Sequence, residues 1–560
     1  MPRMTGRRAL MEQLTADGVR HVFGNPGTTE QGFMDILQDY PAVQFILALH
    51  EGVAVSMADA YARLTRRPAF VELHIAPGLG NALGMLYNAR EGRSPLVVYA
   101  GQSDSRVLFQ EPHLSGPLVE MARPICKWAA QIEHAHDVPA ALRRAFKVAA
   151  EPPQGPVFLS LPMDVLDAEA DVDILPTSYT RARVRADAEA LAEAAALLLA
   201  AERPMLLLGD GVAQADAAGS AVAVAELLGA AILQGSASEF TTPATHPLNV
   251  GSVGVVTPSG LRTALAECDL LLAVGAPVFR FIFPETGASP LPVGAKLIQI
   301  DMNTWELGKN VSPTIAMLAD PGAALDELLV VLQERATPAQ ASRAAQRRAA
   351  IAELTSARRE RAARAARQRW DHAPISAERL MHEVRAALPD NALVFAEAIT
   401  NRPQLDAAIE PDEPERVMHV RGGGIGPGLP GSLGAQLARP DRKVVGICSD
   451  GAAMYSITAL WTAAHHRIPV TYVMLNNASY RILKLNMLHY LGEAAPGRRF
   501  VGMDLVDPEL RFDRLAEAMG VSAWRVEAAE QIGPALRQAL AHDGPSLVDV
   551  LLDSPLSASC

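Results

Sequence analysis

The sequence predicts an α/β protein made of three consecutive domains, each with a mainly parallel β-sheet flanked by helices. Three observations lead to this prediction. Short apolar, β-rich runs alternate with helical patterns along the 560 residues, as in α/β folds. Polar or charged stretches at 168–185 and 343–369 interrupt that alternation. The blocks between the interruptions are of similar size, and each is long enough to bury its own core.

The first domain is expected over residues 1–170. Its strands are apolar runs, at 44–49, 69–73, 96–100 and 157–161. Asn25-Pro26-Gly27-Thr28 follows an apolar pair and marks a strand-to-loop junction, because Pro-Gly is a strong breaker. Glu51 ends the first of these runs and precedes a helical pattern over 52–65. A glutamate there could simply complement a helix N-terminus, so periodicity alone leaves its role open.

The middle domain is expected over 186–335, with strands at 205–208, 231–234, 270–274 and 297–300. A linking helix is expected over 336–374. Its stretch 343–369 carries nine Arg against two Glu among alanines, which favours a solvated helix over a nucleic-acid arm. The third domain is expected over 375–560, with strands at 392–396, 416–420, 443–447, 470–475 and 547–552.

Composition and charge exclude several classes of protein. A net charge of -12 argues against a nucleic-acid partner, whose binding surface would be basic. The four cysteines are far apart and form no Cys-x-x-Cys pair, so neither a disulfide framework nor a zinc site is indicated. No run of eighteen apolar residues is present, and Arg7-Arg8 is not followed by an apolar signal region. We therefore expect a cytoplasmic protein without a membrane partner.

The most specific pattern lies between Asp450 and Asn477. Asp450-Gly451 follows one apolar run, and a second run ends on Asn476-Asn477, with room for one crossover helix over 452–467. Parallel strands would bring the acid and the amide to one sheet edge, as hard oxygen ligands suited to Mg²⁺. Backbone N–H groups at Gly451 would suit a phosphate. An Asp-Gly turn alone is unspecific, since Gly209-Asp210-Gly211 has no matching Asn pair.

With 27 positions between Asp450 and Asn477, the segment resembles the signature of the thiamine diphosphate enzymes, Gly-Asp-Gly followed by Asn-Asn. Ser449 replaces the first glycine, which matters little if its φ is negative. The resemblance covers almost the whole chain and is to the 2-oxo acid decarboxylase/acetolactate synthase family, closest to its benzoylformate decarboxylase branch. It implies thiamine diphosphate and Mg²⁺ as cofactors, and an order of pyrimidine-binding, middle and diphosphate-binding domains.

The resemblance also implies roles for individual residues. Asp450, Asn477 and the Ser479 backbone carbonyl would hold the metal. Glu51, in Glu51-Gly52-Val53-Ala54, matches the glutamate that hydrogen-bonds the pyrimidine ring and favours its imino tautomer. In the glycine-rich stretch 421–434, the Gly423 carbonyl would accept from the cofactor's amino group and Ile425 would enforce its bent form. The remaining cofactor contacts implied are Thr400, Gly451, Ala452 and Tyr480.

The substrate pocket matches the family less closely. His74 matches the first pocket histidine, although a lone histidine at a strand end is often structural. Thr28 takes the place of a serine that would orient the substrate carboxylate. Ile282 stands where a second catalytic histidine is expected, and isoleucine cannot relay a proton. The other residues assigned to the pocket are Gln110, His419, Ile482, Leu483 and Asn486. His419 is either a displaced proton donor or a core histidine, whereas His465-His466 is expected on a solvated helix.

The leading hypothesis is a lyase that decarboxylates a 2-oxo acid to an aldehyde. Because Ile282 replaces a proton donor, a carboligase that joins the intermediate to an aldehyde acceptor is the alternative. A cofactor-binding protein with little turnover is a third hypothesis, which failure to exchange the thiazolium proton would support. The resemblance implies a homodimer at minimum and favours a homotetramer, since family members share the site between subunits.

Overall fold

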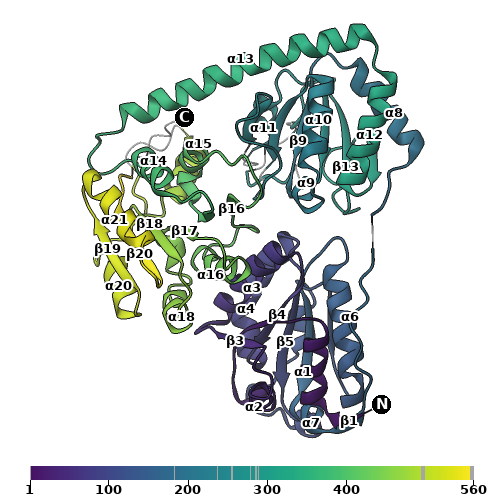
Figure 1. Cartoon of the computed structure of the whole chain (residues 1–560), viewed down its shortest axis with the longest axis vertical. Helices are drawn as coiled ribbons and strands as arrows, with labels where there is room; N and C mark the ends of the chain where they lie inside the picture. Colours follow the sequence, from purple (N-terminus) through teal and green to yellow (C-terminus); the bar gives the residue numbers. More distant parts are fainter. Residues whose placement is uncertain are drawn as a thin grey trace. The chain divides into compact units, whose positions relative to one another are not determined.

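The computed structural model describes all residues except 1, 182, 236–237, 254–256, 278, 284, 286, 288, 493–497, 555 and 557–560. The chain divides into two compact units (Figure 1). Unit 1 comprises Met1–Thr180, Arg369–Leu405 and Val420–Cys560, and unit 2 comprises Arg181–Gln368 and Asp406–His419. Three six-stranded sheets flanked by helices are present, which confirms the predicted fold class.

The first sheet has the strand order β3-β2-β4-β5-β7-β6, and its strands are parallel. Its strands are β2 (His21–Asn25), β3 (Gln44–Leu47), β4 (Ala69–Leu73), β5 (Leu96–Gln102), β6 (Trp128–Gln131) and β7 (Val157–Pro162). β4 and β5 are buried along their whole length, because helices cover both faces of the sheet. β6 was not expected, since its four residues are only half-buried and do not form an apolar run.

Helices cover the two faces of this sheet (Figure 1). On one face lie α1 (Gly6–Ala16) and α6 (Val138–Ala150), over a core that includes Phe33, Phe70 and Tyr99. On the other lie α3 (Glu51–Thr65) and α4 (Ile75–Glu91). The shorter helices are α2 (Gln31–Leu37), α5 (Leu118–Ala122) and α7 (Met163–Asp167), and β1 (Arg3–Thr5) pairs with β8 (Glu169–Asp171).

The third sheet has the order β16-β15-β17-β18-β20-β19. Its strands are β15 (Leu393–Glu397), β16 (Val417–His419), β17 (Val444–Ser449), β18 (Thr471–Asn476), β19 (Ser522–Val526) and β20 (Ser546–Leu551). Its helices include α14 (Ala377–Ala387), α15 (Arg402–Ala408), α16 (Gly428–Ala438), α19 (Arg481–Leu491), α20 (Phe512–Ala518) and α21 (Ile532–Leu540).

Within unit 1, α16 of this last part packs closely on α3 of the first part (Figure 1). A Cβ at Gly434 would lie 2.0 Å from the Met57 carbonyl oxygen, so the close crossing of the two helices requires glycine at this position. Arg439 Nη2 adds a 2.7 Å hydrogen bond to the Leu64 carbonyl. The helix that begins with Glu51 is therefore fixed against the helix that follows the glycine-rich stretch.

The expectation of one crossover helix between β17 and β18 was wrong. Two short helices occupy the segment, α17 (Asp450–Ala453) and α18 (Ala459–His465). The chain turns between them at Ser456. The hydroxyl of Ser456 donates a 2.6 Å hydrogen bond to the carbonyl of Gly426 and not to a neighbouring turn of helix. A long-range contact with the glycine-rich stretch thus overrides local helix propensity.

Unit 2 holds the remaining sheet, with order β11-β10-β9-β12-β13-β14. Its strands are β9 (Pro204–Leu208), β10 (Ala231–Gly235), β11 (Asn249–Val253), β12 (Leu270–Val274), β13 (Lys296–Asp301) and β14 (Ile315–Leu318). Its helices are α8 (Ala188–Ala200), α9 (Asp210–Gln214), α10 (Ala218–Leu228), α11 (Pro258–Ala264), α12 (Pro321–Arg335) and α13 (Pro338–Gln368). α13 is mostly exposed, as the arginine-rich pattern indicated. Among the described residues, no helix is long and apolar enough to cross a membrane.

Candidate active site

Asp450 and Asn477 meet at one edge of the third sheet, because β17 and β18 are adjacent and parallel. Asp450 Oδ2 accepts hydrogen bonds from the backbone N–H groups of Asn477 at 3.0 Å and Ser479 at 3.3 Å. Asp450 Oδ1 accepts from the Gly451 N–H at 2.7 Å, so that N–H is already engaged in this structure. Ser449 has φ of −79°, a conformation open to any residue. The juxtaposition expected from the sequence is present.

This pair suits a hard cation. The pKa of Asp450 is raised to about 6. Burial is the main cause, and hydrogen bonds from the surrounding backbone N–H groups offset part of its effect. The Oδ1 of Asn477 is buried and has no hydrogen-bond partner among the described residues, which is a costly state that a bound cation would relieve. No cluster of three or more His, Cys, Asp or Glu suited to a metal occurs in the described part of the chain. One carboxylate and one amide oxygen are ligands of the kind that Mg²⁺ accepts.

The glycine-rich stretch is held from two sides. The Asn88 side chain, from α4, exchanges two 2.9 Å hydrogen bonds with the Gly424 backbone. Glu397, at the end of β15, accepts from the N–H groups of Gly426 at 2.8 Å and Gly428 at 2.7 Å. Burial raises the pKa of Glu397 to about 7, against the effect of these two donors. Sequence reasoning assigned no role to Asn88 or Glu397, because both act on backbone groups far away in the sequence.

The residues expected around the cofactor belong to unit 1. Gly423 has φ of +95° and open space where a side chain would be, and Ile425 is half-buried beside it. Thr400 lies in a 3-10 turn (Ile399–Asn401) after β15, and Ala452 is buried in α17. Tyr480, at the start of α19, packs over Gly451.

Glu51 is buried at the first turn of α3, with 5% of its surface exposed. Its Oε1 accepts from Asn25 Nδ2 at 3.3 Å, and its Oε2 accepts from Asn81 Nδ2 at 3.0 Å. Asn25 ends β2 and Asn81 lies on α4, so two elements fix the carboxyl group. The carboxyl group is therefore oriented by the fold, beyond what a simple helix N-terminal role requires.

His74 is paired with a buried carboxylate that sequence reasoning missed. Its Nδ1 lies 2.9 Å from Glu30 Oε2, and Glu30 is fully buried. Glu30 also accepts from the N–H groups of Gly27 at 3.0 Å and Gly101 at 2.9 Å. With Glu30 as the acceptor, Nδ1 carries the hydrogen and Nε2 is the nitrogen left for proton exchange. The only signal in the sequence was an acid three residues after the Pro26-Gly27 turn.

We expect Glu30→Gln to lower kcat by about 10- to 100-fold, part of the general acid–base contribution, with a smaller change in KM. The glutamine side chain can still accept a hydrogen bond through its oxygen. It no longer fixes which ring nitrogen of His74 carries the hydrogen. Steady-state kinetics across pH, on samples shown to be folded, measure the effect. Glu120→Gln, at an exposed site of the same domain, should be neutral, and an unchanged pH profile in Glu30→Gln would contradict the role.

Glu72 is a third acidic residue in this region. It is fully buried on β4, in space left by the missing side chain of Gly24, and its two carboxyl oxygens have no hydrogen-bond partner among the described residues. Burial, and then the charges of Glu30 and Glu51, raise its pKa well above the usual range, although the backbone of Asn25 opposes this in part. Its environment therefore favours the neutral form of the Glu72 carboxyl group in the folded protein.

We expect Glu72→Gln to stabilise the protein at neutral pH. Because the folded-state pKa is raised, the contribution of Glu72 to stability is complete below its unfolded pKa of about 4.3 and is lost as pH rises toward the folded pKa. The variant's advantage should grow by up to about 1.4 kcal/mol per pH unit in that window. Denaturant unfolding at several pH values measures it, with Glu120→Gln as the control. A pH-independent difference would contradict the raised pKa of Glu72.

Other residues expected in the substrate pocket are not brought together within one unit. Thr28 and Gln110 are exposed in unit 1, and Ile482, Leu483 and Asn486 lie on α19. Ile282 and His419 belong to unit 2. The Ile282 side chain is 69% exposed, and His419 Nε2 pairs with Asp406 Oδ1 at 3.1 Å.

The expectation that His465-His466 lies on a solvated helix was wrong for His466. Its Nε2 accepts a 2.9 Å hydrogen bond from the Leu47 N–H, and α18 also contributes Thr462 Oγ1 to the Leu47 carbonyl at 3.1 Å. Burial, and then the neighbouring His465, lower the pKa of His466. A neutral His466 therefore helps to join the end of β3 to α18, four residues before Glu51.

Two sheets in one compact unit thus present polar groups at their strand ends. One carries a fixed, buried glutamate, and the other carries a carboxylate–amide pair. The fold and site define an α/β enzyme of the kind that relies on a bound organic cofactor. The chain belongs to the thiamine pyrophosphate enzyme family. Models of its N-terminal binding domain, central domain and C-terminal binding domain match residues 4–113, 191–328 and 405–550.

The relatives include both decarboxylases and carboligases. Benzoylformate decarboxylase of Pseudomonas aeruginosa is 35% identical over 551 residues, 98% of each chain. The large subunit of acetolactate synthase isozyme 1 of Escherichia coli is 27% identical, over 99% of this chain and 94% of that one. A solved structure of the 4-hydroxybenzoylformate decarboxylase of Rhodococcus jostii superposes with a TM-score of 0.85 at 31% identity, covering 99% of this chain and 100% of that one. The protein is therefore an enzyme of the thiamine diphosphate-dependent lyase and carboligase type.

Proposed function

We propose that this enzyme uses thiamine diphosphate and Mg²⁺ to decarboxylate a 2-oxo acid of the benzoylformate class to an aldehyde. The observation that carries the proposal is the donor set at Asp450 and Asn477. A carboxylate already fixed by backbone N–H groups stands beside a buried amide oxygen that has no partner within the described chain. The similarity to two decarboxylases named for benzoylformate substrates supports the choice of substrate class.

The chain's own residues supply binding and proton handling. Asp450, Asn477 and the Ser479 carbonyl would hold Mg²⁺, and the glycine-rich stretch around Gly423 and Ile425 would lie against the cofactor. Glu51, oriented by two amides, would hold or release a proton at the pyrimidine ring. When bound, thiamine diphosphate supplies the carbon nucleophile and the electron sink for loss of CO₂.

The substrate would be handled from the first sheet. The Thr28 hydroxyl, at the start of the 3-10 turn (Thr28–Glu30) after β2, would orient the carboxylate of the 2-oxo acid. His74 Nε2 would deliver or accept a proton, because Glu30 holds its other ring nitrogen. Gln110, Ile482, Leu483 and Asn486 would shape the pocket.

A carboligase is the second candidate, and Ile282 is the observation that favours it. An aliphatic side chain there cannot donate a proton, and His419, the other histidine considered as a proton donor, is paired with Asp406. Slow protonation of the intermediate that remains after loss of CO₂ would give it time to attack a second carbonyl compound, an aldehyde acceptor. Acetolactate synthase among the relatives supports this reading.

Product analysis separates the two functions. The enzyme, loaded with Mg²⁺ and thiamine diphosphate, is incubated with benzoylformate or pyruvate, each with and without an added aldehyde, and products are identified by chromatography. Free aldehyde in every reaction establishes the decarboxylase, and a hydroxyketone formed at the expense of aldehyde establishes the carboligase. Absence of CO₂ release with any 2-oxo acid would overturn both.

The proposal includes a cytoplasmic homodimer at minimum, and a homotetramer as the expected assembly. In this family the glutamate and the diphosphate site of one active centre come from different subunits, as the resemblance implies. Light scattering of the active enzyme tests the assembly, and an active monomer would contradict it.

A further inference from the structure

Asn476, the residue before the proposed metal ligand Asn477, has a buried side chain that joins three segments. It is 5% exposed, and its Nδ2 donates to the Leu510 carbonyl at 3.2 Å and to Asp549 Oδ1 at 3.0 Å. Asp549 lies on β20, next to β18 in the sheet, and is fully buried. The end of β18 is therefore fixed both to the neighbouring strand and to the segment around Leu510.

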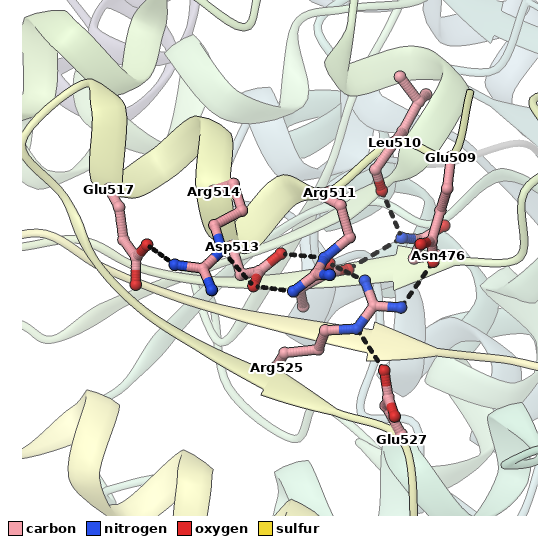
Figure 2. A network of polar contacts seen from close by, with 10 residues as sticks. Asn476, Glu509, Leu510, Arg511, Asp513, Arg514, Glu517, Arg525 and Glu527 are labelled. Atoms are coloured by element: carbon pink, nitrogen blue, oxygen red, sulfur yellow. Dashed lines mark hydrogen bonds and ion pairs between the residues drawn. The ribbon is translucent and has the colours of Figure 1, made fainter. Parts of the chain in front are cut away.

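Asp549 is in turn linked to a surface network of ion pairs. Its Oδ2 lies 3.5 Å from Arg525 Nη1, an ion pair in which neither atom makes a hydrogen bond to the described residues. Figure 2 shows Arg525 between Glu509 and Glu527, and each of these contacts is 2.6 Å. Arg525 thus connects the buried carboxylate with the segment that carries Glu509 and Leu510.

The same segment also holds the loop that contains the proposed metal ligands. The Tyr480 N–H donates to the Met503 carbonyl at 3.0 Å, and Ser479 Oγ donates to the same oxygen at 3.1 Å. The Leu505 N–H donates to the Ala478 carbonyl at 2.8 Å. The loop after β18 is therefore held by residues 503–505, and the far end of that segment is fixed by Asn476 and Arg525.

Two features indicate that this arrangement serves the loop rather than overall stability. Ala478 has φ of +52°, a strained conformation for a residue with a side chain, and such strain persists only where the surroundings enforce it. A buried ion pair contributes little net stability, since desolvation offsets the attraction, and apolar residues would serve a core equally well. Ala478 directly follows Asn477, and the buried Asp549 contacts Asn476, which directly precedes it.

We propose that Asp549 is a positioning residue for the metal loop, which acts through Asn476 to hold Asn477 Oδ1 and the Ser479 carbonyl in place for the cation. The inference rests on the proposed function, because it requires Mg²⁺ at Asp450 and Asn477. Groups that orient metal ligands from behind are typically worth about 10- to 100-fold in metal affinity.

The test is a titration of Mg²⁺ into the full-length protein at saturating thiamine diphosphate, followed by calorimetry, with thermal unfolding of the cofactor-free protein measured in parallel. The variants are Asp549→Ala, which removes both contacts, Asp549→Asn, which keeps an oxygen for Asn476, Asn476→Ala, and the double variant Asp549→Ala/Asn476→Ala. Glu527→Gln, at the exposed end of the same network, is the control.

We expect Asp549→Ala and Asn476→Ala each to weaken Mg²⁺ binding by about 10-fold or more, and the double variant to be no weaker than the worse single one. Asp549→Asn should restore most of the affinity, and Glu527→Gln should bind as the wild type does. Wild-type affinity in Asp549→Ala or Asn476→Ala, whatever their melting temperatures, would overturn the positioning role. Absence of saturable Mg²⁺ binding by the wild type would instead overturn the proposed function.

Discussion

Replacing Glu51 with glutamine is expected to lower kcat by about 10³-fold, within the range of general acid–base contributions, while the affinity for thiamine diphosphate changes by less than about threefold. Glutamine has nearly the same shape, so the contacts that fill the site remain. It cannot exchange a proton with the pyrimidine ring at neutral pH. Either Asn25 or Asn81 can still donate a hydrogen bond to the side-chain oxygen of the glutamine, although not both at once. Steady-state kinetics and cofactor titration measure the two effects separately.

A matched control is Glu189→Gln, which also changes a glutamate in the first turn of a helix but at an exposed position in unit 2. Its activity should equal that of the wild type. If Glu51→Gln retained more than a tenth of wild-type kcat with cofactor bound, Glu51 would be a helix-terminal residue and not the activating acid.

Asn477→Ala is expected to weaken Mg²⁺-dependent cofactor binding by at least about 100-fold, more than the loss of an outer contact to a metal site. The cofactor-free protein should unfold at nearly the wild-type temperature, because the Oδ1 that is removed has no hydrogen-bond partner among the described residues. Removal of an unsatisfied buried group costs little or is favourable. Cofactor binding should therefore fall, while the thermal unfolding of the cofactor-free protein stays nearly unchanged.

Asn391→Ala provides the comparison, since that exposed amide donates to the Asp441 carbonyl in the same part of the chain and lies outside the site. It should leave Mg²⁺ binding unchanged. Undiminished binding in Asn477→Ala would remove Asn477 from the metal site. A large loss of stability without cofactor would show that the side chain has a structural partner.

The strand positions could be predicted well because of burial on both faces. β4 and β12 have the bounds expected from the sequence, since a strand covered by helices on both sides is a continuous apolar run. β6 escaped this reasoning because it is a half-buried edge strand. The two-helix crossover after Asp450 was not predicted, because the helices are interrupted where Ser456 donates a hydrogen bond to the carbonyl of Gly426, which is distant in the sequence.

The residues of the candidate site also fall into two groups, those that the sequence could identify and those that it could not. Asp450, Asn477 and Glu51 could be found because their spacing and their places after apolar runs form a local pattern. Glu30, Glu397 and Asp549 could not. Each acts on groups in other elements, and no property of the adjacent sequence distinguishes a buried, partnered carboxylate from a solvated one.

By itself, the sequence determined the fold class, the order of the sheets and the spacing that brings an acid and an amide to one sheet edge. These follow from periodicity and chain connectivity, which are local properties. Only the tertiary structure decided which nitrogen of His74 remains for proton exchange and that Asn476 is fixed by Asp549. It also decided that the buried carboxyl oxygens of Glu72 have no hydrogen-bond partner in the described part of the chain. Such features depend on the desolvation and hydrogen bonding of groups that meet only when distant segments pack together.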